Sequence, residues 1–97
     1  MNYTLDLIKN TYSASEAKKI IVDLLTSKIN FLNNQIFGEQ ERYGIHSEAK
    51  LNRVSELRLE VERLKDVLQK AETEESEVSL KCQIIMDFIS DKNSVNL

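Results

Sequence analysis

An apolar repeat in steps of three and four residues, unbroken by any proline, constrains this chain more than any other feature. Such spacing places side chains on one face of a helix. Its members are Val54, Leu57, Val61, Leu64, Leu68, Ala71, Glu75, Val78, Cys82, Ile85 and Ile89. Because the spacing continues through the one charged member, it predicts a single helix from about residue 48 to 90. The acidic run at 72–77 leaves a break near Glu75 as the alternative.

A second helix is predicted upstream, over about residues 14–43. The segment Ser13-Ala14-Ser15-Glu16 matches a capping box, in which the Ser13 hydroxyl and the Glu16 carboxylate satisfy free N–H groups. Gly44 is the expected stop, since glycine readily adopts the left-handed conformation that ends helices, and Ser47 caps the next helix. The apolar stripe between these signals consists of Val22, Leu25, Ile29, Leu32, Ile36 and Tyr43.

The segments outside the two helices give weaker signals. Tyr3, Leu5 and Leu7 alternate with polar residues as in a strand, but Ile8 breaks the alternation. A short strand, an extended arm and a helical turn all remain open, and we treat residues 1–12 as an N-terminal arm. The expected organisation is therefore this arm, a helical hairpin domain at 13–91 and a flexible tail at 92–97.

These elements predict an all-α fold, a long antiparallel helical hairpin that dimerises into a four-helix bundle. The second helix would extend beyond the first, and its apolar end would need a second chain to cover it. A parallel two-stranded coiled coil is the competing assembly. The residues expected to mediate self-association are Ile20, Ile21, Leu24, Leu25, Val78, Ile85, Phe88 and Ile89.

Bulk properties narrow the classes of partner. The net charge of −3 lacks the excess of Lys and Arg that nucleic-acid binding requires, and it disfavours an anionic membrane surface. No apolar stretch is long enough to span a membrane, and the N-terminus does not resemble a signal peptide. The single Cys82 fits a reducing compartment, so we expect a cytoplasmic protein.

The chemistry-bearing residues do not combine into a site. His46, the one histidine, falls in the predicted turn without an orienting partner, and Cys82 falls at an apolar position of the repeat. No second His or Cys stands at metal-ligand spacing. We therefore expect no catalytic residue, no metal and no cofactor.

The predicted turn is the best candidate for docking another protein, because aromatic residues and arginine are enriched at interface hot spots. The docking candidates are Phe37, Arg42, Tyr43 and His46. Taken together, the sequence predicts a non-enzymatic helical module for interaction or assembly that acts through homodimerisation. The alternative is a small regulator or antitoxin-like protein that binds a larger protein partner.

Overall fold

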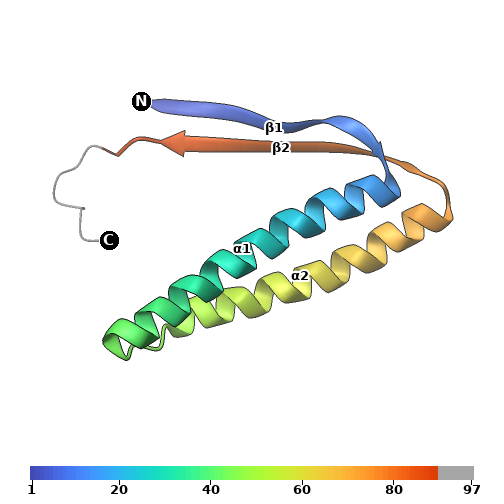
Figure 1. Cartoon of the computed structure of the whole chain (residues 1–97). Coiled ribbons are helices and arrows are strands. Elements are labelled where there is room, and N and C mark those ends of the chain that lie inside the picture. Colours follow the sequence, from blue (N-terminus) through green and yellow to red (C-terminus); the bar gives the residue numbers. More distant parts are fainter. Residues whose placement is uncertain (90–97) are drawn as a thin grey trace. The chain divides into compact units, whose positions relative to one another are not determined.

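The computed structural model describes residues 1–89 and contains two helices flanked by two strands (Figure 1). The order is β1 (Asn2–Ser13), α1 (Ala14–Tyr43), α2 (Glu48–Thr73) and β2 (Glu77–Asp87). The strands pair in a two-stranded antiparallel sheet. The chain divides into two compact units: residues 12–78, which hold both helices, and residues 1–11 together with the segment from 79 onward.

Helix α1 begins and ends where the sequence predicts. The Ser13 hydroxyl accepts the N–H of Glu16 at 3.1 Å, and the Glu16 carboxylate accepts the N–H of Ser13 at 3.1 Å. At the other end Gly44 has φ 65° and donates its N–H to the carbonyl of Gln40 at 3.0 Å. This single bond is the αL form of helix stop, and it needs a residue that tolerates positive φ.

Loss of the Ser13 cap should destabilise the hairpin measurably. Ser13→Ala is expected to lower the free energy of unfolding by about 1 kcal/mol, the usual cost of removing an N-cap. The backbone N–H and then the hydroxyl of Ser13 hold the pKa of Glu16 below its ordinary value. Without the hydroxyl the pKa of Glu16 should rise, which a carboxyl-detected NMR titration of both proteins would measure.

The lowered pKa of Glu16 also fixes the direction of the pH dependence. A carboxylate whose pKa is lower in the folded state stabilises that state above its unfolded pKa, and this contribution disappears as the pH falls through the folded pKa. The stability difference between wild type and Ser13→Ala should therefore narrow on acidification below the ordinary glutamate range. If the stability difference between the two proteins does not change as the pH falls through the pKa of Glu16, the Ser13–Glu16 pair does not contribute to the pH dependence of stability.

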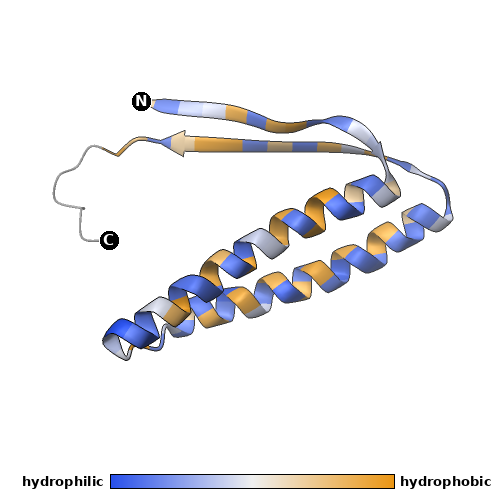
Figure 2. Cartoon of the chain, in the orientation of Figure 1, coloured by the Kyte–Doolittle hydropathy of each residue, from blue (hydrophilic) through white to orange (hydrophobic). Residues whose placement is uncertain are grey.

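The two helices pack along the stripes that the sequence predicts. The core of the hairpin consists of Ile29 and Leu32 from α1 with Val54, Leu57 and Val61 from α2. Val22, Leu25 and Ile36 of α1 pack against this cluster and are partly buried. Figure 2 shows the hydrophobic bands along both helices. Because the core occupies one face of each helix, apolar residues on the other faces remain exposed.

Helix α2 ends at Thr73, so the prediction of one helix from 48 to 90 is wrong. Ser76 donates its N–H to the carbonyl of Ala71 at 2.9 Å, and Glu75 donates to Glu72 at 3.1 Å. These two bonds define a Schellman motif, whose C′ position is Glu75 in the left-handed conformation at φ 56°. The charged residue that interrupts the apolar repeat is therefore the residue that stops the helix.

The segment after this stop is a strand, which corrects the predicted fold class. Residues 77–87 form β2, and residues 2–13, left open between strand, arm and helical turn, form β1. The protein is thus a mixed α/β chain and not all-α. The four-helix bundle, which required the apolar end of a long second helix, is wrong for the same reason. The predicted tail at 92–97 lies outside the described residues.

Two contacts fix the register of the sheet. The N–H of Phe88 donates to the carbonyl of Met1 at 3.0 Å, and the Gln83 amide donates to the Asp6 carboxylate at 2.9 Å. The step from Met1 to Asp6 equals the step from Phe88 back to Gln83, so one antiparallel register connects both contacts without an inserted residue. Since hydrogen-bonding groups alternate along a strand, the N–H groups of Phe88, Met86 and Ile84 point toward β1.

The sheet has one mainly apolar face and one mainly polar face, with Lys9 as the charged exception on the first and Ile8 and Ile85 as apolar exceptions on the second. In this register, odd-numbered residues of β1 lie opposite even-numbered residues of β2 on the same face. The apolar face, named the sheet face below, consists of Tyr3, Leu5, Leu7, Leu80, Cys82, Ile84, Met86 and Phe88. The burial of β2 follows the alternation, because Val78, Leu80 and Cys82 are half-buried while the residues between them are exposed.

Candidate functional site

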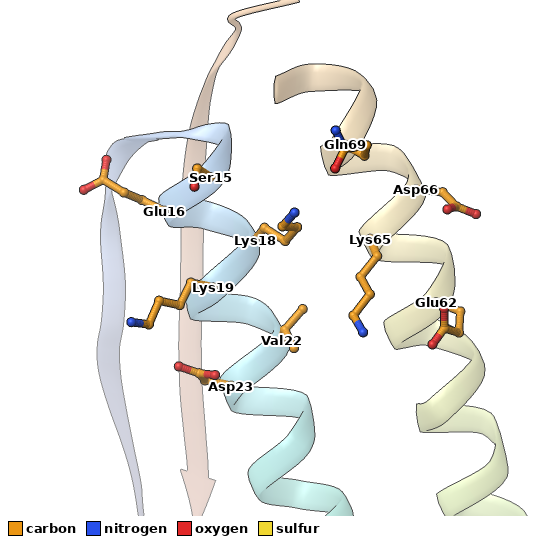
Figure 3. Close-up of a pocket in the computed structure, with 10 residues that line it drawn as sticks. All are labelled: Ser15, Glu16, Lys18, Lys19, Val22, Asp23, Glu62, Lys65, Asp66 and Gln69. Carbon is orange, nitrogen blue, oxygen red and sulfur yellow. The ribbon is translucent and has the colours of Figure 1, made fainter. Parts of the chain in front are cut away.

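One groove lies within the helical hairpin, between the first half of α1 and the second half of α2 (Figure 3). Its volume is about 660 Å³. The lining residues are Ser15, Glu16, Lys18, Lys19, Val22 and Asp23 from α1, and Glu62, Lys65, Asp66 and Gln69 from α2. The Lys18 ammonium lies 3.3 Å from the carboxylate of Glu72, near the end of α2.

This groove holds charges of both signs in a solvated setting. Lysines and carboxylates alternate along its walls, and Lys18, Lys65 and Val22 point into the gap between the helices in Figure 3. Its lining contains no histidine or cysteine. A nucleophile needs a base within hydrogen-bond reach, and this lining does not present such a pair. The groove therefore carries no catalytic assignment.

A second groove of about 500 Å³ lies near the turn between the helices. It contains the ion pair of Lys50 and Glu39, with 2.7 Å between the ammonium and Oε2. Oε1 of Glu39 is buried and has no hydrogen-bond partner. Glu39 of α1 is thus held by a lysine from α2. An ion pair this exposed contributes at most about 1 kcal/mol.

The predicted docking residues lie at this end of the hairpin, and two of the four line the second groove. Arg42 and Tyr43 line the second groove, whereas Phe37 and His46 do not. Phe37 and Tyr43 are 63% and 69% exposed. The His46 ring lies 3.1 Å from the amide nitrogen of Gln40, at the nearer of its two ring nitrogens, and the histidine is exposed. The exposed aromatic side chains keep partner docking at this end open as a prediction.

The residues predicted for self-association divide between the two units. Ile20 and Ile21 of α1 are half-buried, Leu24 is exposed, and Leu25 packs against the hairpin core. The others are in or after β2, not on an extension of a helix: they are Val78, Ile85, Phe88 and Ile89. Ile85, Phe88 and Ile89 are exposed, and Phe88 belongs to the sheet face while Ile85 lies on the other face.

The sheet face is the most extensive apolar surface of the second unit. Large apolar side chains at least 39% exposed lie on both strands: Tyr3, Leu5, Leu7, Ile84, Met86 and Phe88. The sheet has two strands, so each has one edge that no other described segment pairs with. An apolar face combined with open edges is the arrangement through which strands associate with other chains.

Sequence reasoning missed this surface although its signal is present. From Glu77 to Phe88 every even-numbered residue is apolar, and every odd-numbered residue except Ile85 is polar or charged. That alternation has the period of a strand. Sequence reasoning also missed Lys81 and Asp87. They are the two charged residues between Val78 and Phe88, and both are exposed. The helical repeat concealed all of these features.

The chain matches no protein-family model, and no curated protein or solved structure is significantly similar to it. Within residues 1–89, no three histidine, cysteine or carboxylate side chains are grouped as a metal site would require. Over the same residues, neither helix has the length and apolar composition needed to cross a membrane. The function of this chain is therefore inferred from its geometry.

Proposed function

We propose that this protein is a non-enzymatic interaction module that self-associates as a homodimer, with the two-stranded sheet as the interface. The observation that carries the proposal is the exposed sheet face. Tyr3, Leu5 and Leu7 of β1 adjoin Ile84 and Met86 of β2, and all five side chains are substantially exposed. An apolar patch of this kind on a small protein is typical of an association surface.

The size of the sheet supports the same proposal. An isolated two-stranded sheet is at best marginally stable in water, because each strand has a single hydrogen-bonded neighbour. Among residues 1–89 the buried hydrophobic residues are Ala14, Ala17, Ile29, Leu32, Val54, Leu57, Val61 and Leu68, and none of them belongs to β1 or β2. Association of the sheet with a second chain would stabilise the sheet by about 25 cal/mol per Å² of apolar area that becomes buried.

Sedimentation equilibrium over a wide range of protein concentration tests the proposal. We expect a mass that approaches twice that of one chain as the concentration rises. A mass that stays at one chain throughout would contradict homodimerisation, and it would mean that the sheet face is covered within the chain or by another protein. Ile84→Ser, placed on the sheet face of β2, should shift the equilibrium toward single chains, whereas Thr4→Ser on the opposite face serves as the control.

The exposed turn favours a second candidate, which is a small regulator that captures a larger protein. Phe37, Tyr43 and Ile45 are each more than half exposed around the turn of the hairpin. In that case Phe37→Ala with Tyr43→Ala should leave the sedimentation mass and the helical circular dichroism unchanged. If this double variant dissociates the dimer, the turn belongs to self-association and not to a separate partner site.

We place this module in the cytoplasm, since its one cysteine suits a reducing compartment. We assign no catalytic step, no cofactor and no metal to it, and no nucleic acid or membrane partner. The acidic balance, with a net charge of −3, supports a protein partner over a polyanion.

A further inference from the structure

The outer edge of β2 has the pattern of charges that a second copy of the same strand would complement. Because Phe88 directs its N–H toward β1, the odd-numbered residues of β2 direct their backbone groups toward the outer edge. No described segment pairs with that edge. Strand β2 also has no proline along its length to block pairing.

Between Val78 and Phe88 the charges on β2 are Lys81 and Asp87. They are equally distant from Ile84, one on each side of it. If two copies of β2 pair antiparallel about a two-fold axis at Ile84, each Lys81 lies directly opposite Asp87 of the partner subunit. Both are exposed, and neither forms an ion pair within the part of the chain that the structure describes.

The neighbouring registers lose this complementarity. An axis at Cys82 places Asp87 opposite Glu77 of the partner subunit, and an axis at Lys81 places the two lysines opposite each other. Like charges directly opposite each other destabilise a strand pair. An axis between two residues pairs odd-numbered with even-numbered residues. Because opposite residues share a face, the sheet face of one copy then lies on the same side as the polar face of the other. Axes at Gln83 and Ile85 avoid these penalties but leave Lys81 and Asp87 opposite uncharged residues, so the axis at Ile84 is the one that also pairs the two charges.

The outer edge of β1 does not offer an equivalent arrangement. Its charges are Asp6 and Lys9, which are three positions apart, an odd step. Placing them opposite each other in two copies of β1 requires an axis between residues, which turns the two sheet faces to opposite sides. Asp6 also accepts the hydrogen bond from Gln83 within the sheet. The charge pattern therefore favours β2 over β1.

We propose that two copies of this chain join through the outer edges of β2, antiparallel and centred on Ile84, to form a continuous four-stranded sheet. This inference rests on the proposed homodimer and specifies its interface. The strand order becomes β1–β2–β2–β1, so both sheet faces lie on the same side and merge into one apolar surface. Lys81 and Asp87 form an ion pair at each end of the new strand pair.

Charge exchange at these two positions tests the register. Lys81→Asp alone places aspartate opposite aspartate at both ends, and Asp87→Lys alone places lysine opposite lysine. Each single variant should raise the dissociation constant of the dimer about tenfold. Mixed in equal amounts, the two variants should form a heterodimer with nearly the wild-type dissociation constant, since every opposed pair is then complementary. Native mass spectrometry distinguishes the heterodimer from both homodimers.

The controls separate failure of the register from failure of the proposed function. Lys9→Asp makes the same change on β1 and should leave the dissociation constant unchanged. If wild type dimerises but the single variants dimerise equally well and mix statistically, the β2 register is wrong while self-association stands. If the wild-type protein never exceeds the mass of one chain, homodimerisation itself is wrong. The wild-type mass is therefore measured before any variant is made.

A cross-linking measurement tests the register without altering charge. At the axis the two Ile84 residues would face each other as a pair without direct hydrogen bonds, with Cα atoms about 4.5 Å apart, which a disulfide can span. Ile84→Cys in a Cys82→Ala background should therefore form a covalent dimer under mild oxidation. The natural Cys82 would lie about 13 Å along the strand from its counterpart and should not cross-link. Cross-linking through Cys82 and not through position 84 would overturn the inference.

Discussion

Replacement of Leu57 by alanine should lower the free energy of unfolding by about 2–5 kcal/mol, the largest effect expected of any single truncation in this chain. Leu57 is 4% exposed and packs at the centre of the hairpin core with Ile29, Leu32, Val54 and Val61. The variant would lose the transfer free energy of the side chain and would leave a cavity between the helices. Urea denaturation followed by helical circular dichroism would measure the loss.

Leu59→Ala is the matched control for this prediction. Leu59 lies on the same helix and undergoes the same chemical change, but it is 53% exposed. Its replacement should change the free energy of unfolding by no more than about 0.5 kcal/mol. All proteins need the same concentration, because association contributes to apparent stability. Equal losses for the two variants would mean that the helices do not pack through the Leu57 face.

Proline at position 84 should abolish the sheet while leaving the helices in place. Ile84 directs its N–H toward β1, so a proline there removes a donor from the ladder between the strands. An unpaired backbone group of this kind costs about 1–3 kcal/mol, which a two-stranded sheet cannot tolerate. Protection of the Tyr3 and Leu5 amides against hydrogen exchange should fall at least tenfold, with the helical signal retained.

Proline at the next position provides the contrast. Ile85 directs its N–H toward the outer edge of β2, so Ile85→Pro should preserve protection of the β1 amides. The same variant should prevent dimerisation, because it removes a donor from the edge that we assign to the second copy. If Ile85→Pro exposes the β1 amides as strongly as Ile84→Pro does, the alternation of hydrogen-bonding groups that we infer from Phe88 is incorrect.

The helical hairpin could be predicted from sequence because its signals are local and specific. The capping box of Ser13 and Glu16, the stop at Gly44 and the cap at Ser47 each depend on a few adjacent residues, and all are present in the structure. The core stripes follow the same helical period on both sides of the turn. Along this part of the chain, the capping signals and the spacing of the buried residues both indicate helix, so the sequence pattern is compatible with one structure.

The strand β2 could not be distinguished in the same way, because its pattern satisfies two periods. Positions four apart, such as Val78 and Cys82, lie on one face both of a helix and of a strand. Apolar residues three positions apart share a face in a helix but not in a strand. Ile85, the one apolar residue that departs from the strand alternation, lies three positions after Cys82 and so favoured the helix. The deciding feature was the left-handed conformation of Glu75, which glycine signals clearly and glutamate does not. The strand is also stabilised by pairing with β1, which is far away in sequence, and the local pattern of β2 does not show this contribution.

The position of the hairpin between the strands predicts the order in which the protein folds. β1 and β2 are separated by both helices, so pairing them from the unfolded chain carries a large loop-closure entropy. Once the hairpin forms, Ser13 at the start of α1 and Glu77 after the end of α2 line the same pocket. The end of β1 and the beginning of β2 are therefore already close together. We therefore expect the hairpin to form first and to reduce the entropy cost of pairing β1 with β2. Loss of the hairpin should remove the sheet, whereas loss of the sheet should spare the hairpin.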